Sequence, residues 1–298
     1  MIISVASGKG GTGKTTVAVN LGLSLTNVQF IDCDVEEPNA HLFLSPRITR
    51  EREGVLMVPR IEENLCTHCG TCAEVCAYNA LAVIRPNEEQ QGKVLLFEQL
   101  CHGCGACSLL CPQKAITEEP RVIGTVRGGK AGDMDFVDGK LNVGEAMAPP
   151  LIRQAKKQLD TDKTVIIDAS PGTSCPVVTA VKGSDYCLLV TEPTPFGLSD
   201  LNAAVGVLRI LHLPFGVVLN RADIGDDGVE SYCEKNHIPI LLRIPFSRQI
   251  AECYARGIPF VHELKQYRAL FRKLVFDIQR QLQYDSGAPR GVENEAGN

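Results

Sequence analysis

The sequence predicts an α/β protein with a mostly parallel sheet flanked by helices, interrupted by one small cysteine-rich insertion. Three observations lead to this prediction. Short apolar runs alternate with helix-like stretches, which is the pattern of βαβ units in a parallel sheet. A glycine-rich segment at residues 8–16 directly follows the first apolar run. Eight of the 13 cysteines fall between Cys66 and Cys111.

The composition is that of an ordinary globular protein. The chain has 298 residues, 44% hydrophobic and 22% charged, which excludes intrinsic disorder and leads us to expect about two domains. Its formal charge of -5 provides no general attraction to nucleic acid, so we expect no such partner. No run of 18 apolar residues predicts a membrane-spanning helix. The first residues do not resemble a signal peptide, so we expect a cytoplasmic protein with reduced thiols.

The apolar runs define the predicted sheet and the limits of the insertion. Strands are predicted at residues 2–6, 28–32, 165–168, 186–191, 215–220 and 240–244. Residues 1–59 and 119–284 are predicted to form one discontinuous domain, and residues 60–118 a small inserted α+β domain. Within the larger domain, residues 119–150 are rich in Gly and Asp and are predicted to form a loop or a weak hairpin. Residues 285–298 are predicted to be a disordered tail.

The segment from Gly8 to Thr15 fits the phosphate-loop pattern G-x-x-x-x-G-K-[ST] between a strand and a helix. Its glycines allow backbone N–H groups to converge on phosphate oxygens, and the helix N-terminus adds positive charge. Lys14 would reach the β and γ phosphates, and the Thr15 hydroxyl would bind Mg²⁺. The alternative is a glycine-rich turn without a ligand. The predicted nucleotide-binding residues of this segment are Gly8, Gly10, Gly11, Thr12, Gly13, Lys14, Thr15 and Thr16.

The clustered cysteines form two copies of the spacing C-x₂-C-x₂-C-x₃-C. In bacterial ferredoxins this run binds [4Fe–4S] clusters, and its fourth cysteine ligates the other cluster. One predicted cluster is therefore bound by Cys66, Cys69, Cys72 and Cys111, and the other by Cys101, Cys104, Cys107 and Cys76. Zinc is the main alternative, and disulfides are a weaker one. Pro112 follows the second run, but Ala77 follows the first, which weakens the turn prediction there.

Lys9 adds a second lysine to the phosphate loop, and the pattern K-G-G-x-x-G-K-[ST] runs from Lys9 to Thr15. This pattern resembles the deviant Walker A P-loop ATPases, a group that includes MinD, ParA, Mrp and the nitrogenase iron protein. Together with the cysteines, it resembles the subgroup with an inserted two-cluster ferredoxin domain. The resemblance implies Mg²⁺-dependent ATP hydrolysis and a homodimer formed with ATP. It also implies that Lys9 reaches the partner's nucleotide; a solvated loop lysine is the alternative.

Further positions match the family's motifs in the expected order. The resemblance implies that Asp34 positions the attacking water, while Asp32 and Asp168 support Mg²⁺ from the ends of their strands. Two solvated loop carboxylates at Asp32 and Asp34 are the alternative. Asn220 resembles the family's adenine-reading asparagine, and Arg221 and Pro245 belong to segments that would contact the base. The residues implied in catalysis are thus Lys9, Lys14, Asp34 and Asp168.

Three functions are compatible with these motifs. The first is an ATPase whose dimerisation and switch motions gate electron transfer through the two clusters. The second is an ATPase that assembles or carries Fe–S or other metal cofactors, and the third a MinD- or ParA-like positioning ATPase. The first two require a redox or cofactor-assembly partner that the sequence does not identify. A last amphipathic helix at residues 263–282 is expected to pack on the sheet rather than bind a membrane stably.

Overall fold

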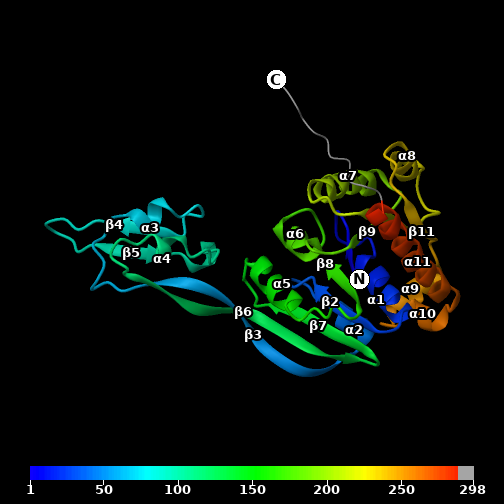
Figure 1. Cartoon of the computed structure of the whole chain (residues 1–298), viewed down its shortest axis with the longest axis horizontal. Coiled ribbons are helices and arrows are strands. Elements are labelled where there is room, and N and C mark those ends of the chain that lie inside the picture. Colours follow the sequence, from blue (N-terminus) through cyan, green and yellow to red (C-terminus); the bar gives the residue numbers. More distant parts are fainter. Residues whose placement is uncertain (288–298) are drawn as a thin grey trace.

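The structure is a computed structural model that describes residues 1–287, of which residues 284–287 are described as backbone alone. A nine-stranded sheet forms its centre, in the order β11-β10-β9-β1-β8-β2-β7-β6-β3 (Figure 1). The strands from β11 to β7 run parallel, whereas β6 and β3 are antiparallel to their neighbours. The parallel strands are β1 (Ile2–Ala6), β2 (Val28–Cys33), β7 (Met134–Leu141), β8 (Thr164–Ala169), β9 (Tyr186–Thr191), β10 (Phe215–Asn220) and β11 (Ile240–Ile244). The predicted α/β fold with a mostly parallel sheet is confirmed.

All six predicted strands are present, four of them with the predicted limits. They were recognisable because the sheet is covered on both faces, so that every residue of β2 and of β9 is buried. Parallel strands place their carboxyl ends at one edge of the sheet. The segments that follow β1, β2, β8 and β10 therefore meet at that edge, where ligands bind in open α/β sheets.

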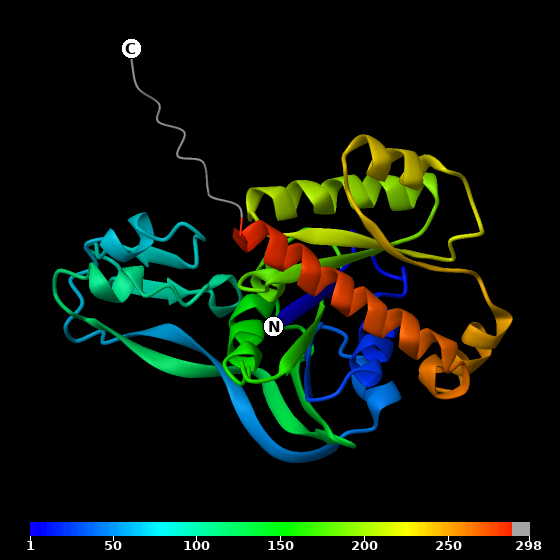
Figure 2. The same cartoon turned by 45° about the vertical axis from the view of Figure 1, so that its right-hand side comes forward.

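Helices cover both faces of the sheet (Figures 1 and 2). One face packs against α5 (Ala148–Lys156), α6 (Cys175–Val181), α7 (Pro195–Ile210) and α8 (Gly228–Lys235). The other packs against α1 (Lys14–Ser24), α2 (Ala40–Leu44), α9 (Arg248–Ala255), α10 (Phe260–Glu263) and α11 (Gln266–Gly287). Cys33, Cys187, Cys233 and Cys253 are buried in these two cores.

The last helix packs on the sheet as expected, through buried Phe271, Leu274 and Ile278. Leu270 of the same helix is 40% exposed. No helix in the described part of the chain combines the length and apolar character needed to cross a membrane. The predicted tail, residues 285–298, lies outside the described residues except for 285–287, which continue α11.

Residues 119–150 were predicted to form a loop or a weak hairpin; the structure has a hairpin, and its two strands belong to the central sheet. This region contributes β7 and most of β6 (Ile116–Ala131), which pairs with β3 (Arg47–Ile61), a strand that was not predicted. Most residues in the first half of β3 are charged and exposed, as is common on an edge strand. The glycines of β6 further weakened the strand signal, because glycine is depleted in strands. Pairing along nearly the whole length of both strands holds them in place.

Beyond the sheet, β3 and β6 continue as a two-stranded ribbon that carries residues 62–115 at its end (Figure 1). We call residues 62–115 the lobe. It contains α3 (Thr71–Glu74), β4 (Leu81–Ile84), β5 (Lys93–Leu96), the 3₁₀ turn η1 (Glu98–Leu100) and α4 (Ala106–Leu109). β4 and β5 form a separate two-stranded antiparallel sheet. The predicted limits of the inserted domain, residues 60 and 118, fall inside the paired strands, so the proposed division there cuts through a continuous ladder.

Candidate functional site

The glycine-rich segment forms a tight loop between β1 and α1. At two positions of this loop, only glycine can be accommodated. Gly13 has φ +88°, and a Cβ atom there would lie 2.5 Å from Nδ2 of Asn220. A Cβ atom on Gly8 would lie 2.2 Å from the backbone oxygen of Asp200. Because side chains are absent here, the backbone can turn closely and leave space in front of the N-terminus of α1.

A cavity of about 410 Å³ lies in front of this loop, at the carboxyl edge of the sheet. It brings together most of the predicted nucleotide-site residues from distant parts of the chain. The predicted residues that line it are Lys9, Gly10, Gly11, Gly13, Lys14, Thr15, Thr16, Asp34, Asn220, Arg221 and Pro245. Gly8, Thr12, Asp32 and Asp168 are not lining residues, and the last three are buried. The cavity is therefore built from the loop after β1 and from the ends of β2, β10 and β11.

Lys14 is the charged centre of the cavity. Its Nζ atom lies 2.6 Å from Oδ1 of Asp168 and 3.6 Å from Oδ2 of Asp34. Burial opposes the charge on Lys14, but the two carboxylates outweigh it and raise the pKa of the lysine. Burial also raises the pKa of Asp34 to about 6, although Lys14 acts in the opposite direction. Lys14 is thus held protonated and directed toward the carboxylates at the phosphate end of the cavity.

Asp32 and Asp168, the two fully buried carboxylates near Lys14, differ in their hydrogen-bond partners. Asp32 accepts hydrogen bonds from the backbone N–H groups of Asp34 (3.0 Å) and Ala40 (3.1 Å), so it fixes the loop after β2. Burial and the charge of Asp168 raise the pKa of Asp32 well above its usual range. Oδ2 of Asp168 is buried without a hydrogen-bond partner. The Lys14 ammonium lies within hydrogen-bond distance of both the Thr15 hydroxyl (3.4 Å) and Asp168 (2.6 Å). A hydroxyl and an unpaired buried carboxylate oxygen at a phosphate loop fit the oxygen ligands that Mg²⁺ prefers.

The far end of the cavity contains three residues that sequence reasoning missed, Phe43, Ile250 and Tyr254. They line it together with Phe246, which belongs to the segment of Pro245 that was expected to contact the base, and the rings of Phe43 and Tyr254 lie 5.3 Å apart. These apolar groups suit a flat base, but they come from α2, α9 and a loop and share no local motif. Asn220 donates a hydrogen bond to the Thr12 carbonyl (2.8 Å), which ties the end of β10 to the phosphate loop.

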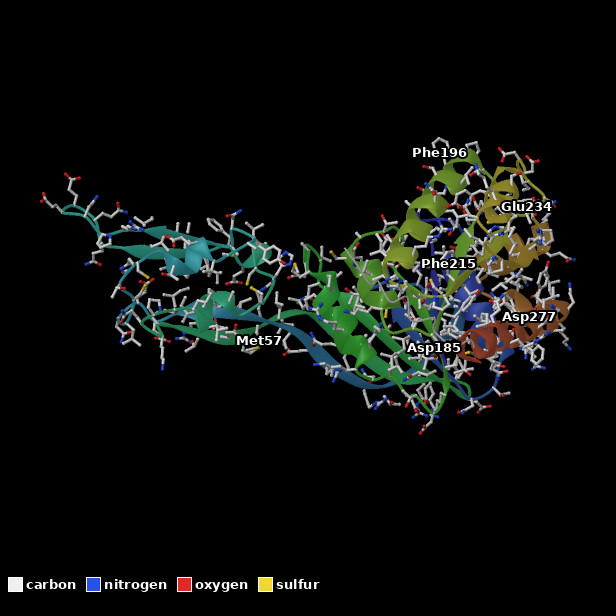
Figure 3. The ribbon with its side chains drawn as sticks, turned by 45° about the horizontal axis from the view of Figure 1, so that its top comes forward. Met57, Asp185, Phe196, Phe215, Glu234 and Asp277 are labelled. Carbon is white, nitrogen blue, oxygen red and sulfur yellow. The ribbon has the colours of Figure 1, made fainter. Side chains whose placement is uncertain are left out.

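Lys9 lines the same cavity, and its side chain contacts α7 in this single chain. Its Nζ atom lies 3.9 Å from Oδ2 of Asp200 and 5.8 Å from the ring centre of Phe196, which is 78% exposed on α7. Phe196 is labelled at the outer end of that helix in Figure 3. The lysine side chain is 34% exposed and its ion pair is weak, so little energy is needed to move the side chain to another position.

The eight clustered cysteines line two separate cavities, four to each cavity. We call the first the outer thiol cavity; it is lined by Cys66, Cys69, Cys72 and Cys111. We call the second the inner thiol cavity; it is lined by Cys76, Cys101, Cys104 and Cys107. Cys101 belongs to the same apolar core as helix α5, whereas Cys72 belongs to a small core within the lobe. In each cavity the fourth cysteine comes from the other sequence run, as in the crossed pattern predicted from the spacing.

The backbone repeats itself around the two cavities. Left-handed residues occur at equivalent places in both runs: His68 and Gly103, Gly70 and Gly105, and Asn79 and Lys114. Backbone N–H groups donate to sulfur in equivalent positions, from Ala80 to Cys76 and from Ala115 to Cys111, each at 3.3 Å. The turns are therefore alike although only the second run has a proline. N–H donors of this kind stabilise thiolates and tune cluster potentials.

Four thiols around one cavity, with backbone donors aimed at the sulfurs, fit the ligand set of a [4Fe–4S] cluster. Within residues 1–287, no three His, Cys, Asp or Glu side chains converge on a point that could hold a single metal ion. A cubane binds each thiolate at a different iron atom, so its ligands do not converge in that way. Cys175 lies outside both cavities, exposed at the start of α6.

The fold and the cavity in front of the glycine loop define a P-loop nucleotide-binding protein. Residues 3–260 match the family described as the CobQ/CobB/MinD/ParA nucleotide-binding domain, and the chain belongs to this family. It is also similar to the uncharacterized protein MJ0579 of Methanocaldococcus jannaschii, with 34% identity over 275 residues, which cover 90% of this chain and 94% of the relative.

The chain is also similar to proteins of lower sequence identity. An iron-sulfur cluster carrier protein of Pyrococcus horikoshii is 26% identical over 284 residues, covering 87% of this chain and 78% of the carrier. The septum site-determining protein MinD of P. horikoshii, solved with Mg-ADP, has a TM-score of 0.57 and 20% identity, covering 96% of this chain and 99% of MinD. The cell division ATPase MinD of Pyrococcus furiosus has a TM-score of 0.55 and 22% identity, covering 94% and 98%. The two solved structures establish the shared fold.

Proposed function

We propose that this protein is a Mg²⁺-dependent ATPase that couples ATP hydrolysis to electron transfer through two [4Fe–4S] clusters held in its lobe. One observation carries the proposal: a phosphate-loop cavity and two four-thiol cavities are built into the same chain. The predicted domains, residues 1–59 and 119–284 for the nucleotide and 60–118 for the clusters, divide the two tasks. When bound, the clusters supply one-electron chemistry, which protein side chains alone do not.

The nucleotide cavity has the groups that phosphoryl transfer to water requires. Catalysis of this kind depends on positioning and on neutralising charge. Lys14 is placed to neutralise the phosphates, and Thr15 and Asp168 are the residues that would hold Mg²⁺. Asp34 lines the cavity and is the candidate for orienting water. The apolar wall at Phe43 and Tyr254 would receive the adenine, with Asn220 and Arg221 at its border.

The proposal is tested by preparing the protein anaerobically and measuring iron, labile sulfide and ATP turnover on the same sample. We expect about eight irons per chain, because each cubane has four. We also expect Mg²⁺-dependent hydrolysis. After the clusters have been reduced with dithionite and the excess removed, we expect ATP to accelerate electron transfer from the protein to an artificial acceptor. Protein that hydrolyses ATP but holds no iron, or holds iron without affinity for adenine nucleotides, would contradict the proposal.

A cluster carrier is the second candidate, supported by the distant relatives that bear that name. The two candidates differ in what leaves the protein. If the clusters are resident, incubation with ATP and an apo-ferredoxin leaves the iron on this chain. If they are cargo, the iron is found on the acceptor after the two proteins are separated.

Replacing Lys9 by alanine is expected to prevent ATP-driven dimerisation while the monomer stays folded. The lysine is partly exposed and makes a long ion pair with Asp200 and a contact with the exposed Phe196 ring, so we expect folding not to depend on it. Multi-angle light scattering with a non-hydrolysable ATP analogue measures the effect. Asp200→Ala is the matched control: it removes the ion-pair partner but keeps the lysine, and should dimerise. Equal dimerisation of the Lys9 variant and the wild type would reject a role across the interface.

A further inference from the structure

Arg121 is a charged side chain on the ribbon between the sheet and the inner thiol cavity. Its ladder partner on β3 is Leu56, whose side chain packs on Gly103 between two of the cavity's cysteines. The next residue of β3, Met57, lines that cavity and is labelled on the ribbon in Figure 3. Glu98, in the 3₁₀ turn that directly precedes Cys101, lies 4.0 Å from Nε of Arg121. Because directly opposed residues of a ladder share one face, Arg121 also lies on the same face as Leu56. The guanidinium is therefore beside the segments that carry the cysteines of the inner cavity.

The position of Arg121 is set by Glu145. The guanidinium pairs with both carboxylate oxygens, at 2.5 and 3.3 Å, and the Glu145 side chain is only 7% exposed. Nε of Arg121 is buried without a hydrogen-bond partner, although Glu98 lies 4.0 Å away. Glu145 in turn accepts hydrogen bonds from the backbone N–H groups of Ala146 and Met147, directly before α5. A bidentate, mostly buried pair of this kind has one preferred geometry.

The other end of this arrangement is the nucleotide cavity. Val35 directly follows Asp34, and its carbonyl accepts a hydrogen bond from the backbone N–H of Leu141 at 2.9 Å. Leu141 ends β7, and the loop that follows is bonded to β6 from Asn142 to Ile123 (3.0 Å) and then reaches Glu145. A shift of the segment at Asp34 would therefore be transmitted to Glu145 through a few residues of paired backbone.

We propose that Arg121 is a positioning residue that conveys the nucleotide state at Asp34 to the inner thiol cavity. This inference rests on the proposed function, because it requires a cluster at that cavity. The guanidinium stabilises the added negative charge when a cluster there is reduced, and its distance from the sulfurs follows the loop of Glu145. The outer cavity has its own arginine, Arg85, whose Nη2 atom donates to the Cys69 carbonyl at 3.3 Å.

The test is a pair of EPR-monitored redox titrations of the full, iron-loaded protein, with ADP and with a non-hydrolysable ATP analogue. In wild type we expect the two nucleotides to give different midpoint potentials for one cluster. Arg121→Met should make that cluster harder to reduce, by about tenfold in its equilibrium constant, which is 59 mV for one electron. It should also remove the nucleotide-dependent difference. Arg85→Met, the matched control, should shift the other cluster and keep that difference.

Two further variants protect the test against misfolding, because Arg121→Met leaves the carboxylate of Glu145 buried and unpaired. The double variant Arg121→Met/Glu145→Gln neutralises both groups and keeps an oxygen for the backbone donors; we expect the same lost difference. Arg121→Lys should keep the charge and part of the difference. If the nucleotide-dependent difference survives in the double variant, the role of Arg121 is rejected while the proposed function stands. A wild type without iron, or without any such difference, would reject the proposed coupling itself.

Discussion

Replacing Lys14 by methionine is expected to lower ATP hydrolysis at least about 100-fold, the usual cost of removing one preorganised charge from a transition state. The lysine is the cation nearest the carboxylates that enclose the phosphate end of the cavity. The same change should destabilise the nucleotide-free protein by about 3 kcal/mol, because it leaves the carboxylate of Asp168 buried without its cation. A phosphate-release assay and urea unfolding measure the two effects.

The two effects can be separated by a second substitution. Lys14→Met/Asp168→Asn removes the unpaired charge, so we expect it to regain most of the stability but none of the activity. Lys235→Met, on the exposed surface of α8, should change neither quantity. A Lys14 variant that still hydrolyses ATP at the wild-type rate would contradict the assignment of this cavity as the catalytic site.

The sequence predicts the parts of the fold that depend on local patterns. The buried strands, such as β9, are continuous apolar runs, and the phosphate loop and cysteine runs have fixed spacings. β3 escaped prediction because its first half is charged and exposed, and β6 because it is rich in glycine, so neither has the continuous apolar run of the central strands. Their discovery matters for function, since the ribbon they form is the physical connection between the nucleotide cavity and the lobe.

In the candidate sites, too, some residues were predictable from local sequence patterns and others were not. Lys14 was identifiable from the spacing of the phosphate loop, and Asp34 and Asn220 from the resemblance of their segments to the motifs of a known family. The base-facing wall at Phe43 and Tyr254 was not, because it arises only when α2 and α9 are folded together. The ion pair between Arg121 and Glu145 could not be predicted either, because a contact between β6 and a loop has no characteristic spacing in the sequence.

The crossed arrangement of the cysteines leads to an expected result that no other ligand scheme shares. The double variant Cys66→Ala/Cys111→Ala removes two thiols from the outer cavity alone, so it should lose one cluster and retain about four irons. Cys66→Ala/Cys76→Ala removes one thiol from each cavity and should lose nearly all iron. If each sequence run held its own cluster, the two results would be exchanged. Iron analysis with EPR of the reduced proteins distinguishes the schemes, and the exchanged result would overturn the assignment of both cavities.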